Sequence, residues 1–209
     1  KLNSVIFSKH PSVLMIAEES TSHGNLTRPV EDGGLGFNMK WNMGWANDFY
    51  EYVSTDPVFR KYNHKALNFP IMYAFTENFC LPISHDEVVH GKGSLFQKLF
   101  GDRGQKLATF RAALLLMMTF PGKKMTFMGS EYGQFREWDY ENQLEWFMLD
   151  YESHRQMQSF NRALNHLYLE RRELWEDDFS WAGYRWMGTE ERDTNTISYV
   201  MDMKWQVVE

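Results

Sequence analysis

The sequence predicts an α/β fold in which parallel strands alternate with helices. Two continuous apolar runs, at residues 13–17 and 79–83, are typical of strands that are buried on both faces. Each run ends abruptly in a polar block, at residues 18–21 and 84–87, and helical segments separate the predicted strands. Alternating strands and helices imply a parallel sheet with helical crossovers. Polar residues at the carboxyl ends of strands favour a (β/α)8 barrel, with an open doubly wound sheet as the alternative.

Hydrophobic spacing and turn residues place the elements along the chain. In the first part of the chain we expect a helix that ends at residues 9–11, a strand at 13–17, a loop at 22–32, a strand at 37–41, a helix at 45–53 and one short helix within 58–77. A strand at 79–83 that bends at Pro82, a helix from Gly101-Asp102 to Pro121 and a strand at 125–128 should follow. A polar loop then runs to about 151 and leads into a long helix with Met157, Phe160, Leu164, Leu167 and Leu174 on one face. Four such strands leave two unpaired edges, which a stable domain must cover. Either the sheet is open, or half of a barrel lies outside this chain.

The pattern changes at about residue 176. Ile197, Tyr199, Met201, Met203 and Trp205 alternate with other residues, which is the period-two signal of a strand. A polar turn at 188–195 precedes this strand, and an aromatic stretch precedes the turn. We therefore predict two units: residues 1–175, and residues 176–209 as a β-hairpin that opens an antiparallel domain.

Composition excludes several classes of function. A net charge of −6 gives no basic footprint for nucleic acid. The longest apolar run, residues 112–120, is too short to span a membrane. A single cysteine, Cys80, excludes a disulfide framework and favours a reducing compartment. The absence of a secretory signal agrees with the cytoplasm, and the start of the chain at Lys1, without Met, suggests an internal fragment.

The polar block after residue 83 has three interpretations. It could be a solvated corner between strand and loop, which is the commonest origin of such a cluster. It could be a metal site, but a zinc protease motif needs two His four residues apart on a helix, whereas His85 and His90 are five apart. It could also be a carboxylate site for acid–base chemistry, which requires a second carboxylate elsewhere. No metal or organic cofactor is implied.

Five segments resemble the 1,4-α-glucan (glycogen) branching enzymes of the α-amylase superfamily. The resemblance extends from near residue 13 to at least residue 175, with the segments in the same order. The SHDEVVHGK sequence at 84–92 is specific to branching enzymes within the superfamily. The segments are residues 15–21 (MIAEEST), 34–37 (GLGF), 40–45 (KWNMGW), 81–92 (LPISHDEVVHGK) and 127–131 (FMGSE).

The resemblance implies a fold and a reaction. The fold would be the second half of a (β/α)8 TIM barrel, strands five to eight, followed by the first hairpin of an all-β C-terminal domain. Enzymes of the family cut an α-1,4 bond in a glucan such as glycogen or amylose and transfer the released chain to a 6-hydroxyl, with retention of configuration. The chain's partners would be this glucan and the upstream half-barrel of the same polypeptide.

The resemblance also assigns roles to residues. Glu18 matches the general acid/base, and His85 and Asp86 match a pair that stabilises the transition state, while Glu19 matches a position without a catalytic role. At the end of an apolar strand, Glu18 is expected to be partly desolvated, which would raise its pKa toward that of a proton donor. Trp41 could stack on a glucosyl unit, although a core Trp at a strand end is an equally good interpretation.

One part of the family's pattern is missing. The nucleophile of the family is an Asp two residues after an Arg at the end of an earlier strand, and no such sequence precedes Glu18. We therefore expect the nucleophile upstream in a parent protein, and no activity from residues 1–209 alone. The alternatives are a related α-glucan hydrolase or debranching enzyme, or a catalytically inactive glucan-binding fragment.

Overall fold

A four-stranded parallel sheet forms the centre of the chain. The structure is a computed structural model, and it describes residues 1–188 and 191–202. The strands are β1 (Ile16–Ala17), β2 (Met39–Trp41), β3 (Phe79–Pro82) and β4 (Lys123–Met125), in the order β1-β2-β3-β4. All three pairings are parallel, as the sequence predicted, with Ala17 beside Lys40 and Cys80 beside both Trp41 and Lys123. The described strands follow one another across the sheet without the reversal that defines a doubly wound fold.

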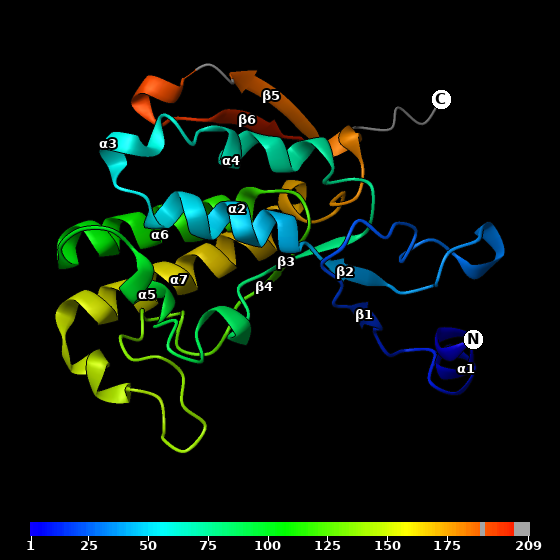
Figure 1. Ribbon diagram of the computed structural model, residues 1–209, viewed down its shortest axis with the longest axis horizontal. Helices are drawn as coiled ribbons and strands as arrows, with labels where there is room; N and C mark the ends of the chain where they lie inside the picture. Colours follow the sequence, from blue (N-terminus) through cyan, green and yellow to red (C-terminus); the bar gives the residue numbers. More distant parts are fainter. Residues whose placement is uncertain (189–190, 203–209) are drawn as a thin grey trace.

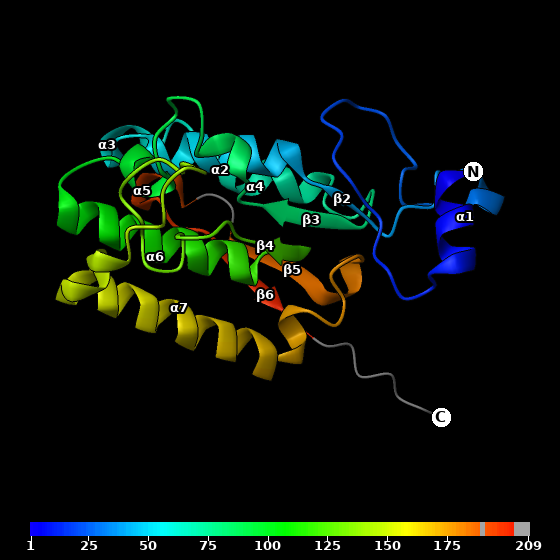
Figure 2. The same ribbon diagram turned by 90° about the horizontal axis from the view of Figure 1, so that it is seen from below.

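Helices connect these strands and pack against one another. Figure 1 shows α2, α6 and α7 running alongside each other, and Figure 2 shows α6 between the other two. At the opposite end of the molecule, α1 lies apart from them near β1. The α-helices are α1 (Leu2–Lys9), α2 (Met43–Ser54), α3 (Pro57–Arg60), α4 (Lys65–Asn68), α5 (Leu95–Lys98), α6 (Arg103–Thr119) and α7 (Glu152–Glu170). Short 3₁₀ turns are η1 (Val30–Asp32), η2 (Phe69–Met72), η3 (His85–Glu87), η4 (Trp146–Asp150), η5 (Arg172–Leu174), η6 (Trp181–Gly183) and η7 (Arg192–Thr194). No helix in the described ranges is long and apolar enough to cross a membrane.

The central helix, α6, follows its sequence signals closely. The Asp102 side chain accepts a hydrogen bond from the Gln105 backbone amide, and the Gln105 side chain accepts one from the Asp102 amide, which satisfies two free donors at the helix start. The helix ends at Thr119, before Pro121. Its apolar face is buried in the main core: Leu107, Phe110, Leu114, Met117 and Met118.

Two neighbouring leucines of α6 test how much this core contributes to stability. Leu114 is fully buried and Leu115 is 44% exposed. We expect Leu114→Ala to lower the free energy of unfolding by about 2–5 kcal/mol, because it removes buried surface and leaves a cavity. Leu115→Ala, the matched control, should cost about 0.5 kcal/mol. Urea unfolding measures both, and equal losses would contradict the packing described.

The segment after α7 forms the predicted hairpin. Strands β5 (Tyr184–Gly188) and β6 (Ser198–Met201) pair antiparallel. Tyr199 stacks on Tyr184 at a centroid distance of 5.3 Å, and its hydroxyl lies 2.6 Å from Thr119 Oγ1 at the end of α6. The hairpin therefore packs on the helical layer. Met203 and Trp205, which were predicted to continue the second strand, lie outside the described residues.

The first predicted strand is much shorter than expected. Only Ile16–Ala17 pair, and Leu14 and Ile16 are 64% and 40% exposed, so the prediction of a strand buried on both faces is wrong. The reason is position: β1 lies at the edge of the sheet, and β2 is its only neighbour among the described strands. A continuous apolar run does not reveal whether both of its faces are covered within the same chain.

Other boundaries also differ from the prediction. The fourth strand begins two residues early, at Lys123, and ends at Met125, because the turn at Gly122 already places Lys123 beside Cys80. Residues 58–77 hold α3, α4 and η2 rather than one short helix. Leu174 lies in η5 and not on α7, since the helix ends at Glu170.

Candidate functional site

Glu18 directly follows β1 at the carboxyl end of the sheet. Its side chain is exposed and makes no hydrogen bond or ion pair within the described part of the chain. The predicted partial desolvation of Glu18 is therefore wrong for this chain, and the cause is again the open edge beside β1. The carboxylate is free to contact a ligand that approaches this end of the sheet.

Glu19, the next residue, is held in place by the neighbouring strand. Its Oε2 accepts a hydrogen bond of 2.8 Å from Lys40 Nζ, and its Oε1 accepts one of 2.7 Å from the Thr21 amide. Lys40 lies in β2 and is 6% exposed. The hydrogen bond from Lys40, followed by that from Thr21, lowers the pKa of Glu19 to about 2. Of the two carboxylates, therefore, only that of Glu18 is free for proton transfer.

His85 and Asp86 open η3, after β3 has ended at Pro82. His85 Nε2 lies 3.2 Å from Asp86 Oδ1, and the two side chains are 50% and 41% exposed. Lys92 stabilises the turn, because its Nζ donates a hydrogen bond of 2.6 Å to the Asp86 carbonyl. The pair is thus oriented by local contacts and open to a ligand.

Both parts of the predicted site follow strands at the carboxyl end of the same parallel sheet. Glu18 follows β1 and the His85–Asp86 pair follows β3, with β2 between these strands. Strands lie about 4.8 Å apart, so β1 and β3 are separated by roughly 10 Å of sheet.

Trp41, the last residue of β2, is partly buried and lines an open pocket of about 670 Å³. The pocket is also lined by Glu19, His23 and Arg28, but not by Glu18, His85 or Asp86. Its size suits a small ligand. Trp41 is only partly buried and is not among the buried core residues.

The polar block after residue 83 forms no metal-binding arrangement among the described residues. Glu87 lies 3.8 Å from Lys92 Nζ, and His90 is exposed in a left-handed turn with φ of 59°. Across residues 1–188 and 191–202, no group of three or more His, Cys, Asp or Glu side chains could hold a metal ion.

Three relatives show what the chain is similar to. It is 49% identical over 203 residues to the 1,4-alpha-glucan branching enzyme GlgB of Halothermothrix orenii, which covers 97% of the chain. It is 50% identical over 200 residues to the enzyme of the same name from Aquifex aeolicus, and 45% identical over 201 residues to that of Clostridium perfringens, each covering 96% of the chain. No protein-family model matches the chain.

The chain is homologous to one segment of the 1,4-alpha-glucan branching enzymes. It spans about a third of these relatives: 32% of the Halothermothrix orenii and Aquifex aeolicus proteins and 30% of the Clostridium perfringens protein. The resemblance noted from the five sequence segments is thereby confirmed.

Glu137 is a residue that the sequence did not reveal. Its carboxylate accepts hydrogen bonds from the amides of Gly91 (2.9 Å) and Gly93 (2.7 Å), and the Trp138 amide donates to the Val88 carbonyl (3.0 Å). These bonds fasten the loop that follows Asp86 to a loop almost fifty residues later. Both glycines have positive φ, so the available signal was the Gly-x-Gly spacing, which identifies a turn but not its partner.

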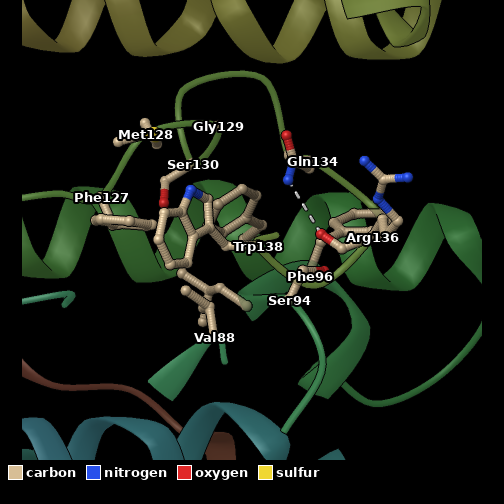
Figure 3. A pocket seen from close by; sticks show the side chains of 13 residues that line it. Val88, Ser94, Phe96, Phe127, Met128, Gly129, Ser130, Gln134, Arg136 and Trp138 are labelled. Carbon is tan, nitrogen blue, oxygen red and sulfur yellow. Dashed lines mark hydrogen bonds between the residues drawn. The ribbon is translucent and has the colours of Figure 1, made fainter. Parts of the chain in front are cut away.

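The same two loops enclose a small cavity of about 20 Å³, shown in Figure 3. Phe127, Val88 and Trp138 gather on one side of it, and Gln134 donates to the Arg136 carbonyl on the other at 3.1 Å. This volume holds about one water molecule. The cavity is therefore a packing feature between the loops that follow β3 and β4.

Glu137 gives a pH-dependent prediction. The two backbone hydrogen bonds, from Gly91 and then Gly93, hold the pKa of Glu137 below its usual value. The carboxylate therefore stabilises the folded chain above its unfolded-state pKa, and this contribution is lost as pH falls through the folded-state pKa. We expect Glu137→Gln to lower the melting temperature near neutral pH, with the difference from wild type shrinking under acid conditions.

Thermal unfolding of both forms across the acid range measures this effect. Glu141→Gln is the matched control, because the Glu141 carboxylate is exposed and accepts no hydrogen bond among the described residues. A difference between wild type and Glu137→Gln that did not change with pH would contradict the proposed attachment of the loop.

Proposed function

We propose that this chain is the segment of a glycogen branching enzyme that carries the general acid/base and the transition-state-stabilising pair. The observation that carries the proposal is identity of 45–50% with branching enzymes over nearly the whole chain. The positions of Glu18, His85 and Asp86, which follow two strands at the carboxyl end of the same parallel sheet, support it. The substrate would be an α-glucan such as glycogen or amylose, and the location the cytoplasm.

The reaction would proceed by two displacements. A carboxylate nucleophile attacks C1 of the donor sugar while Glu18 protonates the departing glycosidic oxygen, which breaks the α-1,4 bond and leaves a glycosyl–enzyme ester. Glu18, now ionised, then removes the proton from the 6-hydroxyl of an acceptor, whose oxygen attacks C1 and forms the α-1,6 branch. Two inversions give net retention.

His85 and Asp86 would act on the sugar at the reacting centre. Asp86 is an exposed carboxylate that favours the positive charge of an oxocarbenium-like transition state. His85, which lies 3.2 Å from it, would donate a hydrogen bond to a sugar hydroxyl. Trp41 would stack on a neighbouring glucosyl unit in the adjacent pocket.

The nucleophile would come from residues outside this sequence. No Arg-x-Asp sequence precedes Glu18, and Asp86 occupies the position of the stabiliser. We propose that residues 1–175 supply strands five to eight of a (β/α)8 barrel, and that 176–209 begin the C-terminal β domain. The uninterrupted order β1-β2-β3-β4 and the antiparallel hairpin support this division. Residues 1–209 alone would then be inactive.

Product analysis tests the proposed function. The full-length protein that contains this chain is incubated with amylose, and NMR measures new α-1,6 linkages while a reducing-end assay measures hydrolysis. A branching enzyme produces new α-1,6 linkages with few new reducing ends. New reducing ends alone would favour a hydrolase, and binding without turnover would favour a non-catalytic glucan-binding protein.

A further inference from the structure

An ion pair with a buried ammonium group directly follows the residue proposed as acid/base. Lys40 Nζ donates to Glu19 Oε2 at 2.8 Å and to the His23 carbonyl at 3.2 Å, so two points of the loop after β1 converge on one ammonium group. The Lys40 side chain is 8% exposed and that of Glu19 is 24% exposed. A buried ammonium group is costly without a compensating charge, and Glu19 supplies that charge.

This ion pair lies just beyond the last paired residue of β1. The pairing of β1 with β2 ends at Ala17 beside Lys40, one residue before Glu18. Glu18 makes no hydrogen bond of its own within the described ranges, so its position depends on the backbone on either side. Glu19 is the first anchored side chain after the strand, with one oxygen on Lys40 and the other on the Thr21 amide.

The two supports hold the backbone of Glu18 from both sides. The β1–β2 pairing fixes Ala17 before it, and the bonds from Lys40 and Thr21 fix Glu19 after it. Catalytic groups need such support, since a displacement of about 1 Å can lower a rate by 10²-fold.

We infer that Glu19 is a positioning residue that holds Glu18 in its catalytic orientation through hydrogen bonds to Lys40 and Thr21. The inference rests on the proposed function. The low pKa of Glu19, about 2, means that the ion pair persists throughout the neutral range.

Three variants of the full-length protein test the inference: Glu19→Gln, Glu19→Asp and the double variant Glu19→Gln/Lys40→Met. A carboxamide has one acceptor and turns an NH₂ group toward the second donor, so Glu19→Gln cannot satisfy both Lys40 and Thr21. We expect Glu19→Gln to lower kcat on amylose by about 10²-fold with little change in KM. Glu19→Asp, which keeps both acceptors, should recover most of the activity.

The double variant separates positioning from simple charge neutralisation. Removing the buried ammonium group should restore the melting temperature lost in Glu19→Gln, while kcat stays low because Glu18 remains unsupported. With α-glucosyl fluoride, whose leaving group needs no proton, the first chemical step of Glu19→Gln should be close to that of wild type. A double variant that regains both stability and kcat, or an equal loss of rate on both substrates, would overturn the inference.

The outcome distinguishes this inference from the proposed function. If the wild-type protein forms no α-1,6 branches, the proposed function itself fails. If the wild type branches and Glu18→Gln is impaired, but the Glu19 variants turn over at the wild-type rate, only the positioning role is wrong.

Discussion

Glu18→Gln in the full-length protein is expected to lower kcat on amylose by about 10²–10⁴-fold, because the variant can neither protonate the leaving oxygen nor deprotonate the acceptor. Glutamine preserves the shape of the side chain, and Glu18 makes no hydrogen bond in the described structure that the change could break, so the melting temperature should stay the same. Initial rates of branch formation measure the effect. Glu31→Gln, at an exposed position in η1, is the matched control and should retain full activity.

The choice of substrate identifies which step Glu18 serves. The fluoride of a donor such as α-glucosyl fluoride leaves without being protonated. Formation of the glycosyl–enzyme should therefore be nearly normal in Glu18→Gln, while transfer to the acceptor stays slow. A variant equally impaired in both steps would indicate a structural role, and a fully active variant would rule out the acid/base assignment.

Asp86→Asn should lower kcat by about 10²–10³-fold and leave glucan binding nearly unchanged. The substitution keeps size and shape but removes the negative charge that favours an oxocarbenium-like transition state. It also alters the contact with His85 at 3.2 Å, so His85→Ala added to Asp86→Asn should cost less than it does alone.

Steady-state kinetics on amylose and affinity electrophoresis in glycogen separate the two effects of Asp86→Asn. Asp32→Asn, in the exposed turn η1, provides the matched control. Wild-type kcat in Asp86→Asn would refute the stabilising role, whereas loss of affinity with unchanged kcat would move Asp86 to ground-state binding.

The sequence was most informative where local signals and core packing agree. A helix was predicted from Gly101-Asp102 to Pro121, and the structure has α6 at Arg103–Thr119 with its apolar residues in the core. The antiparallel hairpin of β5 and β6 followed from the alternation that begins at residue 197 and from the polar turn before it. Predictions were wrong where the burial of a strand depends on whether another strand lies beside it. Residues 13–17 have the composition of an interior strand, but β1 is at the edge of the sheet.

The sequence predicted where the residues of the candidate site lie, but not the contacts that hold them in place. Polar residues after apolar runs predicted that Glu18 and the His85–Asp86 pair lie at the carboxyl end of a parallel sheet. The contacts that hold them join residues far apart in sequence, such as Lys40 with Glu19 and Glu137 with Gly91. No local pattern encodes such pairs, because they depend on how the strands and loops are arranged. The exposure of Glu18 was missed for the same reason.

Isolation of the glycosyl–enzyme tests the central claim most directly, because it identifies the carboxylate that bonds to the sugar. The full-length Glu18→Gln protein is loaded with α-glucosyl fluoride, which forms the ester but turns it over slowly, and the labelled peptide is found by digestion and mass spectrometry. The assigned roles predict a label outside residues 1–209, on an Asp two residues after an Arg. A label on Asp86, or on any other residue of this chain, would contradict them.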